Sequence, residues 1–262
     1  MRGFLFFAAL STLIPLSVQG AGREAVLSEN EKVERLDSVV VSSSRAGKDT
    51  PVTFTMVGKE SLSRSNPINS LPMNLALQPS VVSVNEGGTG LGYSKMTVRG
   101  SKGSQINVTL NGITLNDAES QEVFWVNIPA LSSMISSVQL QRGLGTSANG
   151  AGAFGASINM ESRDKRVESR DKSSYELAFN GGMYNTFREM VSAHIALPSR
   201  WQANARFSKV NSDGFLYRTA SDLYSYYGDL GWYGNRTQVV ARFFGGSEKT
   251  GMGWDGVDYN TA

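Results

Sequence analysis

The chain lacks cysteine altogether and has a single histidine, His194, among its 262 residues. Without thiols, disulfides, thiolate metal sites and cysteine nucleophiles are excluded. A zinc site would have to combine His194 with carboxylates alone, which is poor zinc chemistry. A serine–histidine–aspartate triad would also need His194, and the chain has no G-x-S-x-G motif. Because His194 lies in the alternating run "VSAHIAL", we interpret it as a plain strand residue, and we expect no enzyme activity, cofactor or metal.

An excess of one charge and long apolar runs are lacking as well. The 25 Lys and Arg residues nearly balance the 23 Asp and Glu residues, so the net charge of +2 gives no reason to expect a nucleic-acid partner. Beyond the N-terminus, no stretch approaches the roughly 20 apolar residues of a membrane-spanning helix. Proline is sparse, with 7 residues, whereas glycine is abundant, with 28. This composition favours a turn-rich β protein.

The N-terminus has the pattern of a secretory signal. Arg2 precedes the short apolar run "FLFFAALSTLIPL", and the small residues Val18 and Gly20 stand before Ala21. We therefore predict a signal peptide over residues 1–20 and export from the cytoplasm. Residues 21–35 are polar and are predicted to form a flexible N-terminal arm. The next segment, 36–45 ("LDSVVVSSSR"), has high β-propensity and no neighbouring partner, so we expect it to pair with the edge of another sheet.

The following region, 46–162, alternates short strands with glycine-rich turns. Asn111-Gly112 between two apolar runs predicts a hairpin. Ser70 is expected to cap a short helix that has Pro72 near its start and is ended by Pro79. The expected strands cover residues 81–84, 95–99, 107–110, 113–115, 138–142 and 156–160.

The stretch "RGLGTSANGAGAFGASINM" (142–160) contains a G-x-G-x-x-G pattern at Gly150, Gly152 and Gly155. A dinucleotide-binding loop needs a helix directly after these glycines, so that the helix N-terminus faces the phosphates. Here the β-like run "ASINM" follows instead. We therefore interpret the glycines as turns and close backbone crossings.

After a charged linker, 163–174, the chain alternates apolar and polar residues over segments of about ten residues. Short turns such as 198–200 alternate with longer Gly/Asp-rich segments, expected at 211–222 and 246–256. Glu189 falls on the otherwise apolar side of its segment. The pattern favours outer-membrane strands over the alternative, a soluble β-sandwich. The apolar face is expected to include Tyr175, Leu177, Phe179, Trp201, Phe207, Tyr224, Tyr226, Leu230 and Trp232.

Six motifs in order resemble the plug domain of TonB-dependent outer-membrane receptors. They are "TVRG" (97–100), "NVTLNGITLND" (107–117), "VNIPAL" (126–131), "SSVQLQRG" (136–143), "GTSANGAGAFGASINM" (145–160) and the preceding "LPMNLALQPSV" (71–81). Ser80 stands where the family usually has glycine. The resemblance implies a mainly β fold: an α+β plug over 46–162, followed over 175–262 by the first ~5 antiparallel strands of an incomplete transmembrane β-barrel of about 22 strands.

The resemblance also implies partners and site residues. Residues 36–45 resemble a TonB box, which would add as a strand to the periplasmic domain of TonB through Asp37, Ser38, Val39, Val40, Val41 and Ser42. The alternative is that 37–43 is simply the first plug strand. Ligand contacts are expected from two outward loops, at Asn85, Glu86, Gly87, Gly88, Gly90 and Tyr93, and at Asn116, Asp117, Glu119, Gln121, Glu122, Phe124 and Trp125. The alternative is that both are ordinary surface turns.

Arg99 and Arg142 match the family's paired plug arginines, which are expected to pair with glutamates on the barrel wall; the alternative is pairing within the plug. The expected function is import of a scarce large nutrient across the outer membrane with energy from the inner-membrane TonB motor. Candidate ligands are a ferric chelate, haem or cobalamin. Because roughly five strands cannot close a barrel, we expect a truncated chain that does not transport alone and that could stay periplasmic. A secreted or periplasmic β-rich binding or adhesion module is the alternative.

Overall fold

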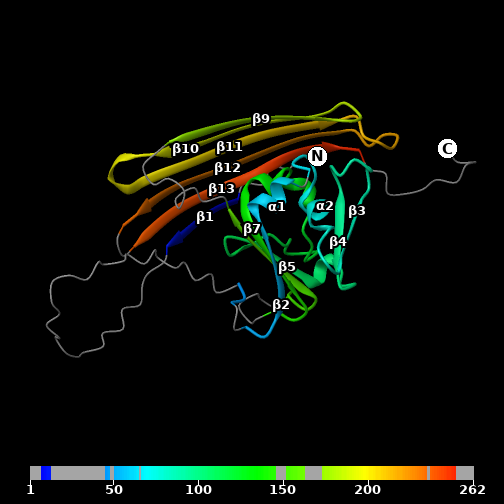
Figure 1. The fold of residues 1–262 in the computed structure, drawn as a ribbon, viewed down its shortest axis with the longest axis horizontal. Coiled ribbons are helices and arrows are strands. Elements are labelled where there is room, and N and C mark those ends of the chain that lie inside the picture. Colours follow the sequence, from blue (N-terminus) through cyan, green and yellow to red (C-terminus); the bar gives the residue numbers. More distant parts are fainter. Residues whose placement is uncertain are drawn as a thin grey trace, which may run out of the picture.

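Two β units of different character make up the fold in the computed structural model (Figure 1). The structure describes residues 7–12, 45–47, 50–64, 66–145, 152–162, 173–234 and 237–251. A small α+β unit, here called the plug, covers one face of a long curved antiparallel sheet, here called the wall. Among the described residues, no helix is long and apolar enough to cross a membrane.

The plug is organised around a mixed five-stranded sheet in the order β2-β7-β8-β5-β6. In this sheet, as far as the chain is described, β5 and β8 form the one parallel pair, and a separate hairpin joins β3 to β4. The expected strands are confirmed, although β7 begins three residues earlier than predicted. The elements are β2 (Thr53–Gly58), α1 (Lys59–Arg64), α2 (Leu71–Leu75), β3 (Val81–Asn85), β4 (Ser94–Val98), β5 (Ile106–Leu110), β6 (Ile113–Thr114), β7 (Ile135–Arg142) and β8 (Ala156–Ser162), with single-turn 3-10 helices η1 (Gly103–Gln105), η2 (Trp125–Asn127) and η3 (Leu131–Ser133).

Local turn chemistry accounts for the β5–β6 hairpin. Asn111 and Gly112 both have positive φ, +52° and +82°, as a type I′ turn requires. The expected cap of α2 is wrong in its chemistry: Ser70 occupies the N-cap position, but its hydroxyl bonds to that of Ser94 at 2.8 Å instead of to the helix. The helix also ends at Leu75, before Pro79 is reached.

The glycine motif leads into a strand and not into a helix. Of its three glycines, Gly150 lies outside the described residues. Gly155 immediately precedes β8, and its N–H donates to the Gln105 carbonyl at 2.9 Å. A Cβ at this position would lie 2.2 Å from the Ser101 side chain. The interpretation as a close backbone crossing is therefore confirmed for Gly155.

The wall consists of consecutive antiparallel strands, the predicted five. They are β9 (Ser174–Gly182), β10 (Thr186–Ala196), β11 (Trp201–Ser212), β12 (Ser221–Tyr233) and β13 (Gln238–Thr250), with η5 (Pro198–Arg200) in the turn between β10 and β11. The expected loop at 246–256 is wrong over its first half, because Gly246–Thr250 pairs with β12 as part of β13. The loop expected at 211–222 is likewise shorter, since β11 runs to Ser212 and β12 begins at Ser221.

A sixth strand, β1 (Phe7–Thr12), pairs antiparallel with the other edge of β13, from Phe7 opposite Phe244 to Thr12 opposite Val239. This strand lies within the segment predicted to be a signal peptide, and the signal itself stays a prediction. The edge of β13 offers unpaired backbone groups, which an apolar segment of good β-propensity can satisfy.

The faces of the wall agree with the predicted alternation. Tyr175, Leu177 and Phe179 on β9 are 73%, 70% and 66% exposed on the outer face. The inner face carries Arg188 and His194 of β10, which are buried on the side of the plug. Glu189 is on the outer face, as expected. The core of the plug is apolar and includes Leu75, Val98, Leu131, Val138, Leu140, Ile158 and Met160.

Candidate functional site

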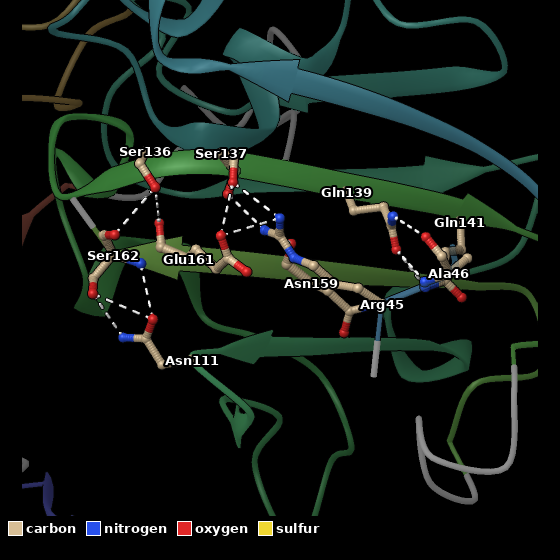
Figure 2. A network of polar contacts seen from close by, with 10 residues as sticks. All are labelled: Arg45, Ala46, Asn111, Ser136, Ser137, Gln139, Gln141, Asn159, Glu161 and Ser162. Carbon is tan, nitrogen blue, oxygen red and sulfur yellow. Dashed lines mark hydrogen bonds and ion pairs between the residues drawn. The ribbon is translucent and has the colours of Figure 1, made fainter. Parts of the chain in front are cut away.

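The predicted TonB-binding residues, Asp37–Ser42, lie outside the described residues. The described chain resumes at Arg45, which is docked on the plug sheet (Figure 2). Its guanidinium donates to the Ser137 hydroxyl at 3.0 Å and to the Asn159 carbonyl at 2.9 Å. It also forms an ion pair with Glu161 at 3.3 Å. The residue that ends the predicted TonB box is therefore attached to β7 and β8, two central strands of the plug.

The next residue, Ala46, is held by a side chain that mimics a strand partner. Gln139 accepts from the Ala46 N–H at 2.7 Å and donates to the Ala46 carbonyl at 2.9 Å (Figure 2). Gln141 in turn donates to the Gln139 side-chain oxygen at 2.8 Å. Burial lowers the pKa of Arg45, and the carboxylate of Glu161 opposes this effect. Sequence reasoning missed Gln139 and Glu161; the only signal was the polar alternation Ser137-Gln139-Gln141 within an otherwise apolar strand.

The first predicted ligand loop, between β3 and β4, is organised by Asn85. The Asn85 amide donates to the carbonyls of Leu91 and Tyr93, and its oxygen accepts from the Gly90 N–H at 2.9 Å. Asn85, Glu86, Gly87 and Tyr93 are half-buried, Gly88 is exposed, and Gly90 is buried.

This loop approaches the wall closely at Gly88. The residue has φ +74°, and a Cβ there would lie 2.7 Å from the ring of Phe215, in the wall loop 213–220. The described neighbour of this glycine is thus a side chain of the protein itself. Phe215 also packs edge-on against Tyr184 with ring centroids 5.4 Å apart. Contact of the loop with a ligand stays a prediction.

The second predicted loop, 116–125, is a compact turn. Asn116 bonds to both β5 and Gln121. Asp117 accepts from Ser120 and Glu119, and these bonds, with those from Ser120 largest, lower the pKa of its carboxyl group. Asn116 and Glu122 are half-buried, and Asp117, Glu119, Gln121 and Phe124 are exposed. Trp125, which was expected to contact a ligand, is only 7% exposed, because its ring packs in the hydrophobic core.

Lys95 of β4 interacts electrostatically with carboxylates of both loops. Its ammonium lies 2.9 Å from the carboxylate of Glu86 in the first loop. The pKa of Lys95 is raised by the hydrogen bond and charge of Glu86 and, to a smaller extent, by Glu122 in the second loop. Burial raises the pKa of Tyr93, helped by Glu248 of the wall and by Glu86. The Tyr93 phenol is therefore protonated at neutral pH and remains a hydrogen-bond donor.

Arg142 is 7% exposed and bonds within the plug. Its Nε donates to the Pro79 carbonyl at 3.0 Å, and one Nη donates to the Thr55 hydroxyl at 2.7 Å. Arg99 is exposed, and its guanidinium reaches the Arg142 carbonyl at 3.5 Å. Burial lowers the pKa of Arg142, and the positive charge of Arg99 lowers it further. These contacts correspond to the alternative, pairing within the plug; pairing with wall glutamates stays a prediction.

The plug and the wall are joined by arginines that sequence reasoning did not single out. Arg188 of β10 and Arg206 of β11 point inward, and both donate to the Ser133 hydroxyl in η3. Arg206 also reaches the Ala130 carbonyl at 3.4 Å. A charged donor is worth more than a neutral one in such a bond, so these two contacts fix η3 against the wall.

His194 is an inward-facing residue of β10, as its alternating context predicts. Its Nδ1 lies 2.8 Å from the Asn204 side-chain oxygen, and Asn204 donates to Asp229 at 2.8 Å. Its described partner is thus an amide on the neighbouring strand, which fits the role of a strand residue in a polar inner face.

These features define a class of protein: a plug anchored inside a wall of strands that are apolar on their outer face. Residues 46–157 match the TonB-dependent Receptor Plug Domain family. No curated protein matches this sequence. Together with the strands that follow, this part of the chain has a fold similar to that of several solved structures.

Three solved structures illustrate the likeness. The copper transporter OprC matches with a TM-score of 0.64 and 16% identity, over 76% of this chain and 32% of its own. The pyoverdine outer membrane receptor FpvA from Pseudomonas aeruginosa PAO1 matches with a TM-score of 0.60 and 16% identity, over 78% of this chain and 29% of its own. The ferric-catecholate import receptor Fiu from E. coli K12 matches with a TM-score of 0.60 and 15% identity, over 77% of this chain and 28% of its own. The chain thus spans less than a third of each structure, and the likeness concerns the fold.

Proposed function

We propose that this chain is the plug and first wall strands of an outer-membrane receptor that imports a scarce metal chelate with energy supplied by TonB. The observation that carries the proposal is the order of parts along the chain. A valine-rich segment, 36–45, comes directly before a plug domain, and its last residue, Arg45, is docked on the plug sheet. A strand-forming arm tied to a plug suits a partner that binds by adding a strand and then pulls.

The proposed ligand class is supported by the names of the similar structures, which are a copper transporter, FpvA bound to pyoverdine with iron, and a ferric-catecholate import receptor. Haem and cobalamin remain further candidates from the sequence. The two loops around Lys95 offer both signs of charge, together with the phenol of Tyr93 and the exposed ring of Phe124. Such a mixture suits a polar chelate with an organic framework.

The test is retention of the detergent-solubilised chain by the immobilised periplasmic domain of TonB. Val40→Pro should abolish retention, because proline removes a backbone donor and cannot continue a strand ladder. Val33→Pro, in the preceding arm, is the matched control and should be retained like the unmodified chain. Equal retention of the unmodified chain and Val40→Pro would contradict strand addition at this segment.

A further inference from the structure

The guanidinium of Arg142 joins parts of the plug that are far apart in sequence. Thr55, one of its hydrogen-bond acceptors, is on β2, and Pro79, the other, is in the turn that leads into β3. Arg142 is itself the last residue of β7. A single buried side chain thus bridges β2, β7 and the start of the β3–β4 hairpin.

Strand β2 is the first strand of the plug among the described residues, and it lies at the edge of the sheet. Its sheet partner is β7, with Thr53 opposite Arg142 and Gly58 opposite Ser137. An edge strand is held from one side, so tension on its N-terminal end can separate it one pair at a time. The docked residues Arg45 and Ala46 precede it and would have to be released first (Figure 2).

The β3–β4 hairpin is closed at its base by the residues next to Pro79. The Arg99 N–H donates to the Ser80 carbonyl at 2.9 Å, and both residues have positive φ, +51° and +65°. Arg99 also contacts the Arg142 carbonyl. The other end of this hairpin is the loop 85–93, whose conformation is held by Asn85. A change at Pro79 therefore acts on the base of the element that carries the first predicted ligand loop.

We propose that Arg142 is a positioning residue that transmits displacement of β2 to the β3–β4 hairpin. When β2 leaves the sheet, Arg142 loses the Thr55 hydroxyl while it remains beside the positive charge of Arg99. A buried cation that loses an acceptor reorients toward water. The Pro79 carbonyl then loses its donor, and the hairpin base loosens. The use of this relay in transport rests on the proposed function, whereas the relay itself does not require TonB.

The experiment is hydrogen–deuterium exchange of the full chain in detergent micelles, followed over the hairpin amides at 81–98. Thr55→Val removes the acceptor and keeps the β-branched shape, and it should speed exchange in the hairpin by about tenfold. Thr53→Val is the matched control, because Thr53 lies on the same face of β2 and is exposed. It should leave the hairpin unchanged. Thr55→Ser restores a hydroxyl and should recover most of the protection.

Arg142→Gln tests whether the two residues act together. Exchange in the hairpin should rise with this variant and should rise no further when Thr55→Val is added, because the bond is already lost. Unchanged hairpin exchange in Thr55→Val, or an equal increase throughout β5 and β8, would overturn the relay. Adding the TonB domain then separates the proposals: protection of 39–41 reports strand addition, whereas the response of the hairpin reports Arg142.

Discussion

The plug and the wall differ in the side chains that they bury. Val138, Leu140 and Ile158 in the plug sheet are completely buried, and their neighbours are apolar. In the wall the buried face mixes polar residues such as Arg188, at 2% exposure, and Ser225, at 0%, with apolar ones such as Leu223, while the outer face is largely aromatic and aliphatic. Side chains alternate between two faces in the strands of both units. The difference in buried side chains therefore depends on what covers each face of the sheet.

This contrast follows from the surroundings of each unit. The plug has an apolar interior of the kind that water-soluble domains have, because burial of apolar area stabilises it. The wall directs its polar side chains at the plug, where Ser133 and the Ala130 carbonyl supply hydrogen-bond partners. Its apolar face is suited to lipid. The plug–wall contact thus combines these hydrogen bonds with apolar packing, in which Val210 and Leu223 of the wall join Ile68, Leu91 and Val126 of the plug.

The largest expected effect tests the apolar core of the plug. Leu140→Ala should lower the free energy of unfolding by about 2–5 kcal/mol, because it removes buried methyl groups and leaves a cavity. Leu177→Ala is the same change on the outer face of the wall, where the side chain is 70% exposed, and it should cost much less. Urea unfolding in detergent micelles, followed by tryptophan fluorescence, measures both. Equal losses would show that the two faces are not different in kind.

The next effect tests the polar contact between the units. Ser133→Ala removes the acceptor shared by Arg188 and Arg206, and it should destabilise docking of the plug by about 1–3 kcal/mol. Ser247→Ala, an exposed position on β13, serves as the control and should be neutral. Protease cleavage within the plug, measured against urea concentration, gives the difference. If Ser133→Ala behaves like the control, the two arginines do not hold η3.

The smallest effect concerns one backbone position in the plug. Ser80 has φ +65°, a left-handed conformation that glycine adopts without strain. Ser80→Gly should therefore stabilise the plug by about 0.5–1 kcal/mol, the excess of relieved strain over the added entropy of the unfolded chain. Ser83→Gly, within β3, should have the opposite sign, since it loses the bond to the Pro72 carbonyl. Calorimetry or urea unfolding of both variants checks the signs.

Sequence-based prediction succeeded where the structure of a short segment is determined by residues within that segment. The Asn111-Gly112 turn, the alternation of the wall strands and the strand after Gly155 were all predicted from neighbouring residues. It failed where the position of a side chain depends on residues that are distant in the sequence. Trp125 was expected on the surface of a loop, but its ring packs in the core of the plug. Ser70 was expected to cap a helix, but its hydroxyl bonds to that of Ser94 instead of to a helix N–H.

The sequence by itself therefore determined the plug motifs, the period of the strands and the apolar side of the wall, because these depend on residues a few positions apart. Only the tertiary structure decided that Arg45 docks on Ser137, 92 positions away, and that Thr55 meets Arg142, 87 positions away. Such contacts depend on which strands become neighbours in the sheet, and periodicity along the chain carries no information about that order.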